Sequence, residues 1–237
     1  MLKTFKIGGA HPEENKLSEN SAIEVIEAPA TVYVMMNQNL GAPSVPVVAK
    51  GDKVKTGQLI AKGEAFISAA VHSPVSGTVD KVDFYTDTTG YRKPVIIINK
   101  EGDEWAEGID TSDTLIKEIK ASKEEIIDSI KSSGIVGLGG ATFPTHVKMA
   151  VPQGKTAEYL IINAVECEPY LTSDHRLMLE KGDEIMIGVQ ILMKALGVTK
   201  AIIGIENNKP EAISHLTGIA KNYPGITVQG LKVKYPQ

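Results

Sequence analysis

The segment with the clearest chemistry is a glycine loop at residues 134–148, which places four glycines within its first seven residues. Glycine lets backbone N–H groups approach an anion closely. The residues after the loop are predicted to be helical, so a helix N-terminus would point at the same anion. Gly137, Gly139 and Gly140 are therefore candidates for binding a phosphate group.

A second polar cluster follows a predicted buried strand at residues 159–163. Asn163, Glu166 and Glu168 stand at its carboxyl end, where ligands bind in parallel sheets. The two glutamates face the same way if this segment is still extended. Glu206 ends the next predicted strand. The glycine loop and these carboxylates together indicate a nucleotide or flavin site.

Each of these features also has an ordinary interpretation. The loop matches neither the dinucleotide fingerprint nor the phosphate-binding P-loop, and glycines also cluster at plain turns. Phe143 and Lys148 would add a stacking surface and a cation, yet they are equally a core aromatic and a solvated lysine. Glu166 and Glu168 could simply cap a helix or a turn.

Composition excludes several classes of function. The formal net charge of -4 and pI near 5.8 argue against binding to nucleic acid or to anionic lipid. Cys167 is the single cysteine, so these residues hold neither a thiolate zinc site nor the ligands of an iron–sulfur cluster. We interpret Cys167 as a small buried residue. No apolar run is long enough to span a bilayer.

The patterning predicts an α/β protein in three parts: an extended segment (1–30), a small all-β module (31–109) and a parallel-sheet α/β domain (110–237). In the last part Ser122 begins a helix that stops before Gly134. Further elements are expected as strands over 159–163, 201–205, 226–228 and 231–233 and as helices over 183–196 and 211–223.

The all-β module resembles biotinyl and lipoyl carrier domains, with tight turns expected at residues 51–52 and 76–77. Such carriers attach their cofactor to a lysine at a hairpin tip. The matching position falls at or next to Phe66, and no lysine occurs from Glu64 to Ser76. We therefore interpret this module as a scaffold or docking module rather than a swinging arm.

Two motifs carry a family resemblance. Residues 137–148 with 163–169 resemble the FMN- and NADH-binding motif pair of the flavoprotein subunit of respiratory complex I. With residues 7–16 and 168–176 added, the chain is more similar to the C subunit of Rnf-type ion-translocating ferredoxin:NAD oxidoreductase complexes, over essentially its whole length. The resemblance implies a barrel-sandwich hybrid module followed by an FMN/NADH-binding domain.

The resemblance also implies roles for individual residues. Those expected at FMN are Gly137, Gly139, Gly140, Lys148, Asn163, Glu166 and, by a looser match to the family, Glu206. Those expected at NADH are Phe143, which would stack on adenine, and Glu168. No side chain need act as a general acid or base, and no metal ligand is expected. The protein's task would be to hold the nicotinamide ring and the flavin ring in contact.

The activity implied is electron transfer in a membrane-bound translocase. Hydride would pass between NAD(H) and FMN, and electrons would move onward to two [4Fe-4S] clusters of the full-length protein. Partners would be the other membrane subunits and a ferredoxin-linked electron chain, with peripheral attachment at the cytoplasmic face of the cell membrane. Family members continue beyond the flavin domain, so we expect this chain to be truncated, its flavin site incomplete and the fragment inactive alone.

Two departures from the complex I pattern keep a second hypothesis open. Val165 stands where those relatives carry aspartate, and Asn207 where they carry a second acidic residue. Both changes remove charge near the expected flavin. The alternative is an assembly or electron-relay subunit with a non-catalytic nucleotide site.

Overall fold

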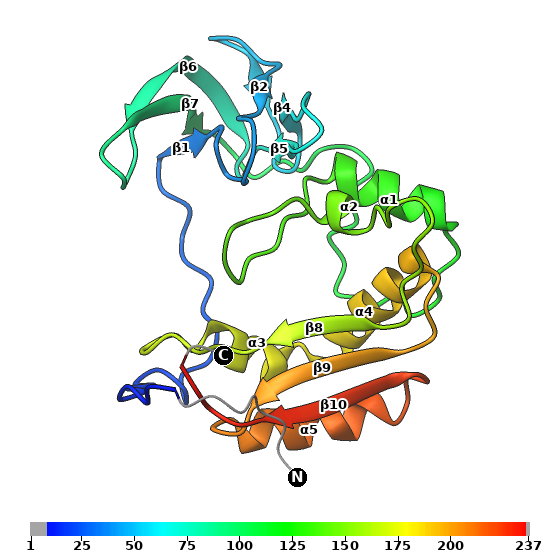
Figure 1. The fold of residues 1–237 in the computed structure, drawn as a ribbon. Coiled ribbons are helices and arrows are strands. Elements are labelled where there is room, and N and C mark those ends of the chain that lie inside the picture. The colour runs from blue at the N-terminus through cyan, green and yellow to red at the C-terminus, as the bar shows by residue number, and fades with distance from the viewer. Residues whose placement is uncertain (1–8, 236–237) are drawn as a thin grey trace. The chain divides into compact units, whose positions relative to one another are not determined.

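The structure, a computed structural model, describes residues 9–235 (Figure 1), so its description begins inside the motif at residues 7–16. The chain forms two compact units. The β unit comprises residues 26–114 and 124–150, and the α/β unit comprises residues up to 25, 115–123 and 151 onward. The glycine loop thus packs with the β unit, although it precedes the α/β strands directly. The expected domain limits at 30 and 109 stay a prediction.

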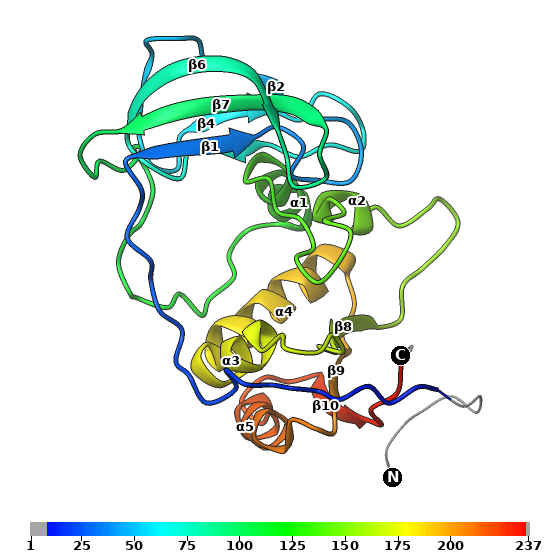
Figure 2. The same cartoon turned by 90° about the vertical axis from the view of Figure 1, so that its left-hand side faces the viewer.

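The β unit contains the two small sheets of a barrel-sandwich hybrid. One sheet has the order β1-β7-β6-β3 and the other β2-β4-β5, and all their pairings are antiparallel. Strands β1, β7 and β6 of the first sheet are labelled in Figure 2. The strands are β1 (Thr31–Met35), β2 (Val45–Pro46), β3 (Lys53–Val54), β4 (Leu59–Lys62), β5 (Val71–His72), β6 (Gly77–Thr86) and β7 (Arg92–Lys100). The predicted all-β module is confirmed.

Alternating apolar residues of both sheets form the core of this unit, with Ile60, Ile96 and Ile98 fully buried. The expected turn at residues 76–77 is wrong, because Gly77 begins β6 and pairs with Val54. A side chain at Gly77 would collide with the Asn99 carbonyl, so close strand approach requires this glycine.

Helix α1 (Lys123–Ser132) begins directly after Ser122 and buries Ile126 and Ile130, as its periodicity predicts. Gly134 ends it in the left-handed conformation, with φ 67°, and a Cβ there would collide with the Ala70 carbonyl. The helix expected after the glycine loop is only α2 (Thr145–Lys148), a single turn. It is too short for a helix dipole to serve an anion.

The α/β unit has a three-stranded parallel sheet in the order β10-β9-β8, which confirms the predicted parallel layer. Its strands are β8 (Leu160–Ala164), β9 (Ala201–Glu206) and β10 (Ile226–Leu231). Its helices are α3 (Ser173–Glu180), α4 (Gly182–Leu196) and α5 (Pro210–Ala220). Helix α3 has no counterpart among the predicted elements, and the separate strand expected over 231–233 is wrong, since β10 ends at Leu231.

The three helices contact one another and cover one face of this sheet (Figure 2). Leu160, Ile203 and Ile205 point into the core that they form. On the other face Ile161 is 70% exposed, so the alternation along β8 separates a buried face from an open one. Asn163 shares this open face with Ile161 because strand side chains repeat every second residue.

Tyr223 joins the end of α5 to the start of α4, since its hydroxyl donates to Asp183 at 2.6 Å. This hydrogen bond, with burial second, raises the pKa of Tyr223 to about 12. Its folded pKa exceeds the unfolded value near 10, so its stabilisation is complete below pH ~10 and is lost as the pH rises toward 12. Urea unfolding at several pH values should show a decline in stability that Tyr223→Phe reduces. Identical pH profiles for the two proteins would refute this role.

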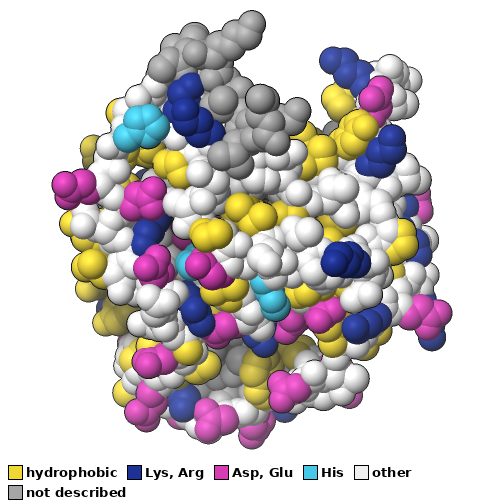
Figure 3. All heavy atoms as spheres, turned by 90° about the horizontal axis from the view of Figure 1, so that it is seen from below, with side chains coloured by type: hydrophobic (Ala, Val, Ile, Leu, Met, Phe, Trp, Pro, Cys, Tyr) yellow, Lys and Arg dark blue, Asp and Glu magenta, His cyan; other side chains and the backbone are white. Residues whose placement is uncertain are grey.

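No helix within residues 9–235 is long and apolar enough to cross a membrane. The face seen in Figure 3 carries acidic and basic side chains interspersed rather than gathered into one basic patch. This distribution fits the low pI and offers no electrostatic footprint for a nucleic acid on that face.

Candidate functional site

The glycine loop is a closed hairpin rather than an extended ribbon. Val136 and Pro144 form an antiparallel bridge, and the Gly137 N–H donates to the Phe143 carbonyl at 3.0 Å. Thr145 N–H donates to the Ile135 carbonyl at 2.9 Å. These bonds hold the base of the loop and leave residues 138–142 as its tip.

The tip has the geometry that an anion requires. Nothing lies within 4 Å of a Cβ built at Gly139 or Gly140, so a ligand can reach the backbone there. Within the described chain, the N–H groups of Gly139, Gly140 and Ala141 donate no hydrogen bond. A side chain at Gly137 would collide with the Lys148 ammonium, which therefore lies against the loop. Open glycines, N–H donors and an adjacent cation fit the phosphate end of FMN.

The half-buried Phe143 sits at the end of this tip, where Thr142 adopts a positive φ of 50°. A non-glycine residue in this conformation is uncommon and marks a tightly determined backbone. The Thr142 carbonyl accepts from Leu40 N–H at 3.2 Å, which ties the tip to the strand-rich part of the same unit. Phe143 therefore has a defined position next to the open glycines.

The acidic side chains after β8 in the α/β unit differ in exposure and direction, which their sequence spacing does not predict. Strand β8 ends at Ala164, so Glu166 and Glu168 do not continue its alternation. Glu166 is 5% exposed, whereas Glu168 is exposed, so the expectation that they face the same way is wrong. Asn163 is exposed at the strand end, and its Oδ1 accepts from Val165 N–H at 3.0 Å in a local turn.

Glu166 caps helix α3. Its Oε1 accepts from Asp174 N–H at 2.7 Å and from the Ser173 hydroxyl at 3.3 Å. Its Oε2 is buried and has no hydrogen-bond partner in the described chain. Burial and then the Glu166 charge raise the pKa of Asp174. Glu166 thus combines a structural cap with one carboxylate oxygen that lacks a donor, which fits a ligand that donates a hydrogen bond.

Glu206 forms a buried ion pair with Lys209, with 3.6 Å between Oε2 and Nζ and exposures of 1% and 3% for the two side chains. The Lys209 ammonium also donates to the Asn208 Oδ1 at 3.1 Å and to the Glu166 carbonyl at 3.4 Å. Burial lowers the pKa of Lys209, and the Glu206 charge opposes this shift. The Glu206 carboxylate is thus engaged inside the unit, and no sequence pattern marks Lys209 as its partner.

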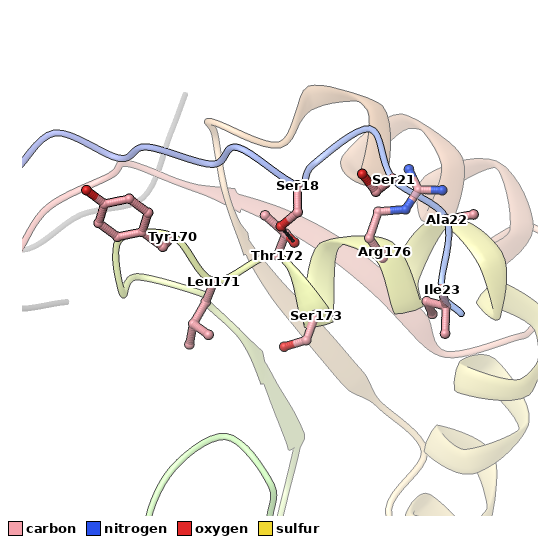
Figure 4. A pocket seen from close by; sticks show the side chains of 9 residues that line it. All are labelled: Ser18, Ser21, Ala22, Ile23, Tyr170, Leu171, Thr172, Ser173 and Arg176. Atoms are coloured by element: carbon pink, nitrogen blue, oxygen red, sulfur yellow. Dashed lines mark hydrogen bonds between the residues drawn. The ribbon is translucent and has the colours of Figure 1, made fainter. Parts of the chain in front are cut away.

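Cys167 is exposed, so its interpretation as a buried hydrophobe is wrong. It lies in the segment between β8 and α3, which turns away from the core once the strand has ended. Beside this segment is an open hollow of about 340 Å³, lined by residues from the N-terminal segment and the start of α3. Figure 4 shows Ser18 facing Thr172 and Arg176 reaching toward the N-terminal segment. The hollow therefore lies between the N-terminal segment and the start of α3, within one unit.

The structure brings the predicted residues together in two groups. Asn163, Glu166, Glu168 and Glu206 lie at adjacent strand ends of the α/β unit, because Ala164 pairs with Ile205 in register. Gly137, Gly139, Gly140, Phe143 and Lys148 lie together in the β unit. Each group thus belongs to a single unit.

Comparisons with known proteins match these two regions. Residues 3–103 match a family model described as the RnfC barrel sandwich hybrid domain, and residues 130–237 match one described as the Nuo51 FMN-binding domain. The chain is 48% identical to the C subunit of the proton-translocating ferredoxin:NAD(+) oxidoreductase complex of Clostridium ljungdahlii, over 100% of this chain and 51% of that relative.

The chain belongs to the RnfC family, the C subunits of ion-translocating ferredoxin:NAD oxidoreductase complexes. A second member, from the Na(+)-translocating complex of Acetobacterium woodii, is 40% identical over 99% of this chain and 52% of the relative. This chain therefore spans about half the length of these curated relatives.

A solved structure, the NAD+-reducing [NiFe]-hydrogenase in its air-oxidized state, is also similar. It is 23% identical, covers 48% of this chain and 21% of its own, and superposes with a TM-score of 0.38. The family match confirms the expected architecture of a barrel-sandwich hybrid domain followed by an FMN-binding domain.

Proposed function

We propose that this chain holds FMN and NAD(H) in the electron-transfer subunit of a membrane-bound ferredoxin:NAD oxidoreductase. The observation that carries the proposal is the glycine-loop tip, whose N–H groups donate to nothing in the described chain and whose glycines leave space for a ligand. The family match over residues 130–237 supports FMN as that ligand.

In this proposal Gly137, Gly139 and Gly140 shape the loop around the FMN phosphate and ribityl chain, and the Lys148 ammonium offsets phosphate charge. Asn163 and Glu166 are proposed FMN ligands from the family motif, with an exposed amide and a carboxylate Oε2 that has no hydrogen-bond donor in the described chain. Glu206 acts through its ion pair with Lys209 rather than by direct contact.

Phe143 and Glu168 would bind the nicotinamide nucleotide, by stacking on adenine and by accepting hydrogen bonds from a hydroxyl. Bound FMN would supply a two-electron acceptor for hydride and return electrons singly. The chain's own residues then have one task, to hold the two rings in contact and exclude competing geometries. No general acid or base is needed.

The intact subunit has further proposed roles. Electrons would pass to two [4Fe-4S] clusters outside these residues and between NAD(H) and a ferredoxin-linked chain. The subunit would attach peripherally to other membrane subunits at the cytoplasmic face. The β unit would act as a docking scaffold, because the connection between β4 and β5 carries the exposed Phe66 in place of a modifiable lysine.

A second candidate function is an assembly or electron-relay subunit with a non-catalytic nucleotide site. It is favoured by Val165 and Asn207, which replace acidic residues of the complex I pattern, and by the internal bonds that occupy Glu166 and Glu206. The two functions differ in one property, the affinity for NADH.

Titration of the FMN-loaded intact subunit with NADH separates them. Phe143→Ala and Glu168→Gln should each weaken NADH binding by about tenfold, the value of one stacking contact or one charged hydrogen bond. Phe66→Ala and Glu158→Gln are matched controls, because both residues are exposed and neither is among the proposed ligands. If Phe143→Ala and Glu168→Gln leave the affinity for NADH unchanged, the result would favour the assembly function.

A further inference from the structure

The side chain of Lys16 is bound by three backbone carbonyls of one short segment. Its Nζ lies 3.0 Å from the Glu166 oxygen, 2.8 Å from the Glu168 oxygen and 2.8 Å from the Leu171 oxygen. An ammonium group has three donors, so these three acceptors saturate it. In the described chain Lys16 makes no ion pair within 4.0 Å, so the fixed carbonyls are its counterpart.

These carbonyls belong to residues 165–172, the acidic loop, which joins β8 to α3 and has no regular secondary structure. Within it Tyr170 adopts φ 69°, which is a strained conformation for a bulky residue. Such strain persists only where surrounding contacts over-determine the backbone. The contacts here come from outside the loop, since Tyr170 N–H donates to the Glu14 carbonyl at 3.0 Å.

Lys16 and Glu14 belong to an N-terminal strap, residues 10–23, that runs along the carboxyl ends of the strands and the edge of α3 (Figure 1). The strap is anchored along its whole length. Its anchors are an Ala10–Tyr235 bridge, Glu14 to Asn208 at 2.9 Å, Ser18 to Thr172 at 2.7 Å, the Glu19 carbonyl to Arg176 at 3.1 Å and Ile23 N–H to Glu180 at 3.1 Å. Lys16 therefore has a fixed platform from which to hold the loop.

We propose that Lys16 is a positioning residue that sets the backbone of the acidic loop and so presents Glu168 and Glu166 to the nicotinamide nucleotide and the flavin. The inference rests on the proposed function. It makes the N-terminal strap part of the binding site, although Lys16 touches no proposed ligand. Of the three loop carbonyls that Lys16 binds, Lys209 contacts only that of Glu166, at 3.4 Å.

The test compares Lys16→Met with wild type in the FMN-loaded intact subunit. NADH affinity should fall by at least about tenfold, because the loop loses three charged hydrogen bonds and must then be ordered when NADH binds. Amide exchange should accelerate in residues 165–172 and stay unchanged in β9. Lys221→Met is the matched control, because it removes an exposed lysine of the same unit that lies outside the strap and the acidic loop; it should bind NADH like wild type.

A chemical rescue keeps the test decisive if Lys16→Met folds poorly. In Lys16→Ala, added ethylammonium should restore NADH affinity, whereas tetramethylammonium, which has no N–H donor, should not. Equal effects of the two salts would overturn the proposal, as would a Lys16→Met protein with wild-type affinity. A wild-type protein that binds neither FMN nor NADH would instead remove the proposed function, and this inference with it.

Discussion

Lys209→Met should lower the free energy of unfolding by about 3–5 kcal/mol, the usual cost of leaving one member of a buried ion pair without its partner. Lys209 is 2% and Glu206 1% exposed, so water cannot replace the lost ammonium. Urea unfolding of both proteins at neutral pH measures the effect.

The double variant Glu206→Gln with Lys209→Met is the control for this prediction. It removes both charges, so most of the stability should return, and the difference from the summed single variants gives the coupling energy. A Lys209→Met protein as stable as wild type would mean that the pair at the end of β9 does not hold the strand end in place.

Gly139→Val and Gly140→Val should each weaken FMN binding by at least about tenfold while leaving stability within about 0.5 kcal/mol. Neither glycine has a positive φ, and nothing lies within 4 Å of a Cβ at either position, so the fold accepts a side chain that the ligand cannot. Flavin fluorescence quenching on titration gives the affinity.

Gly134→Ala is the matched contrast in the same loop. Its φ of 67° and the nearby Ala70 carbonyl make it a structural glycine, so alanine should cost at least about 1–2 kcal/mol of stability. Equal losses of stability at all three glycines would show that the loop is a plain turn. If Gly139→Val and Gly140→Val keep full stability but bind FMN weakly, and Gly134→Ala instead loses stability, then residues 138–142 are the part of the loop that faces the ligand.

Local patterns in the sequence are sufficient for most of the elements. Apolar runs predict β8 and β9, although one face of β8 is exposed, and the capping pattern at Ser122 predicts α1, because these signals depend on neighbouring residues. Helix α3 escapes prediction because its cap is the side chain of Glu166, seven and eight residues upstream of the groups that it binds. Such a cap has no fixed local spacing.

The sequence predicts which polar residues lie near the strand ends, but it does not predict how their side chains are arranged. The extended segment that would align Glu166 with Glu168 ends at Ala164, and the loop beyond it is shaped by Lys16, which lies 150 residues from Glu166 in sequence. Glu206 resembles a ligand in sequence because its buried partner Lys209 looks like any surface lysine. The Lys16 contact joins distant segments, and the Glu206–Lys209 pair depends on the burial of both side chains. A local pattern contains neither.

The most direct test of the central claim is anaerobic addition of NADH to the FMN-loaded intact subunit, followed by the visible absorption of the flavin. The proposed function predicts rapid bleaching in wild type, and slower bleaching at low NADH concentration in Phe143→Ala and Glu168→Gln. A subunit that binds FMN but whose flavin is reduced by neither NADH nor NADPH would contradict it.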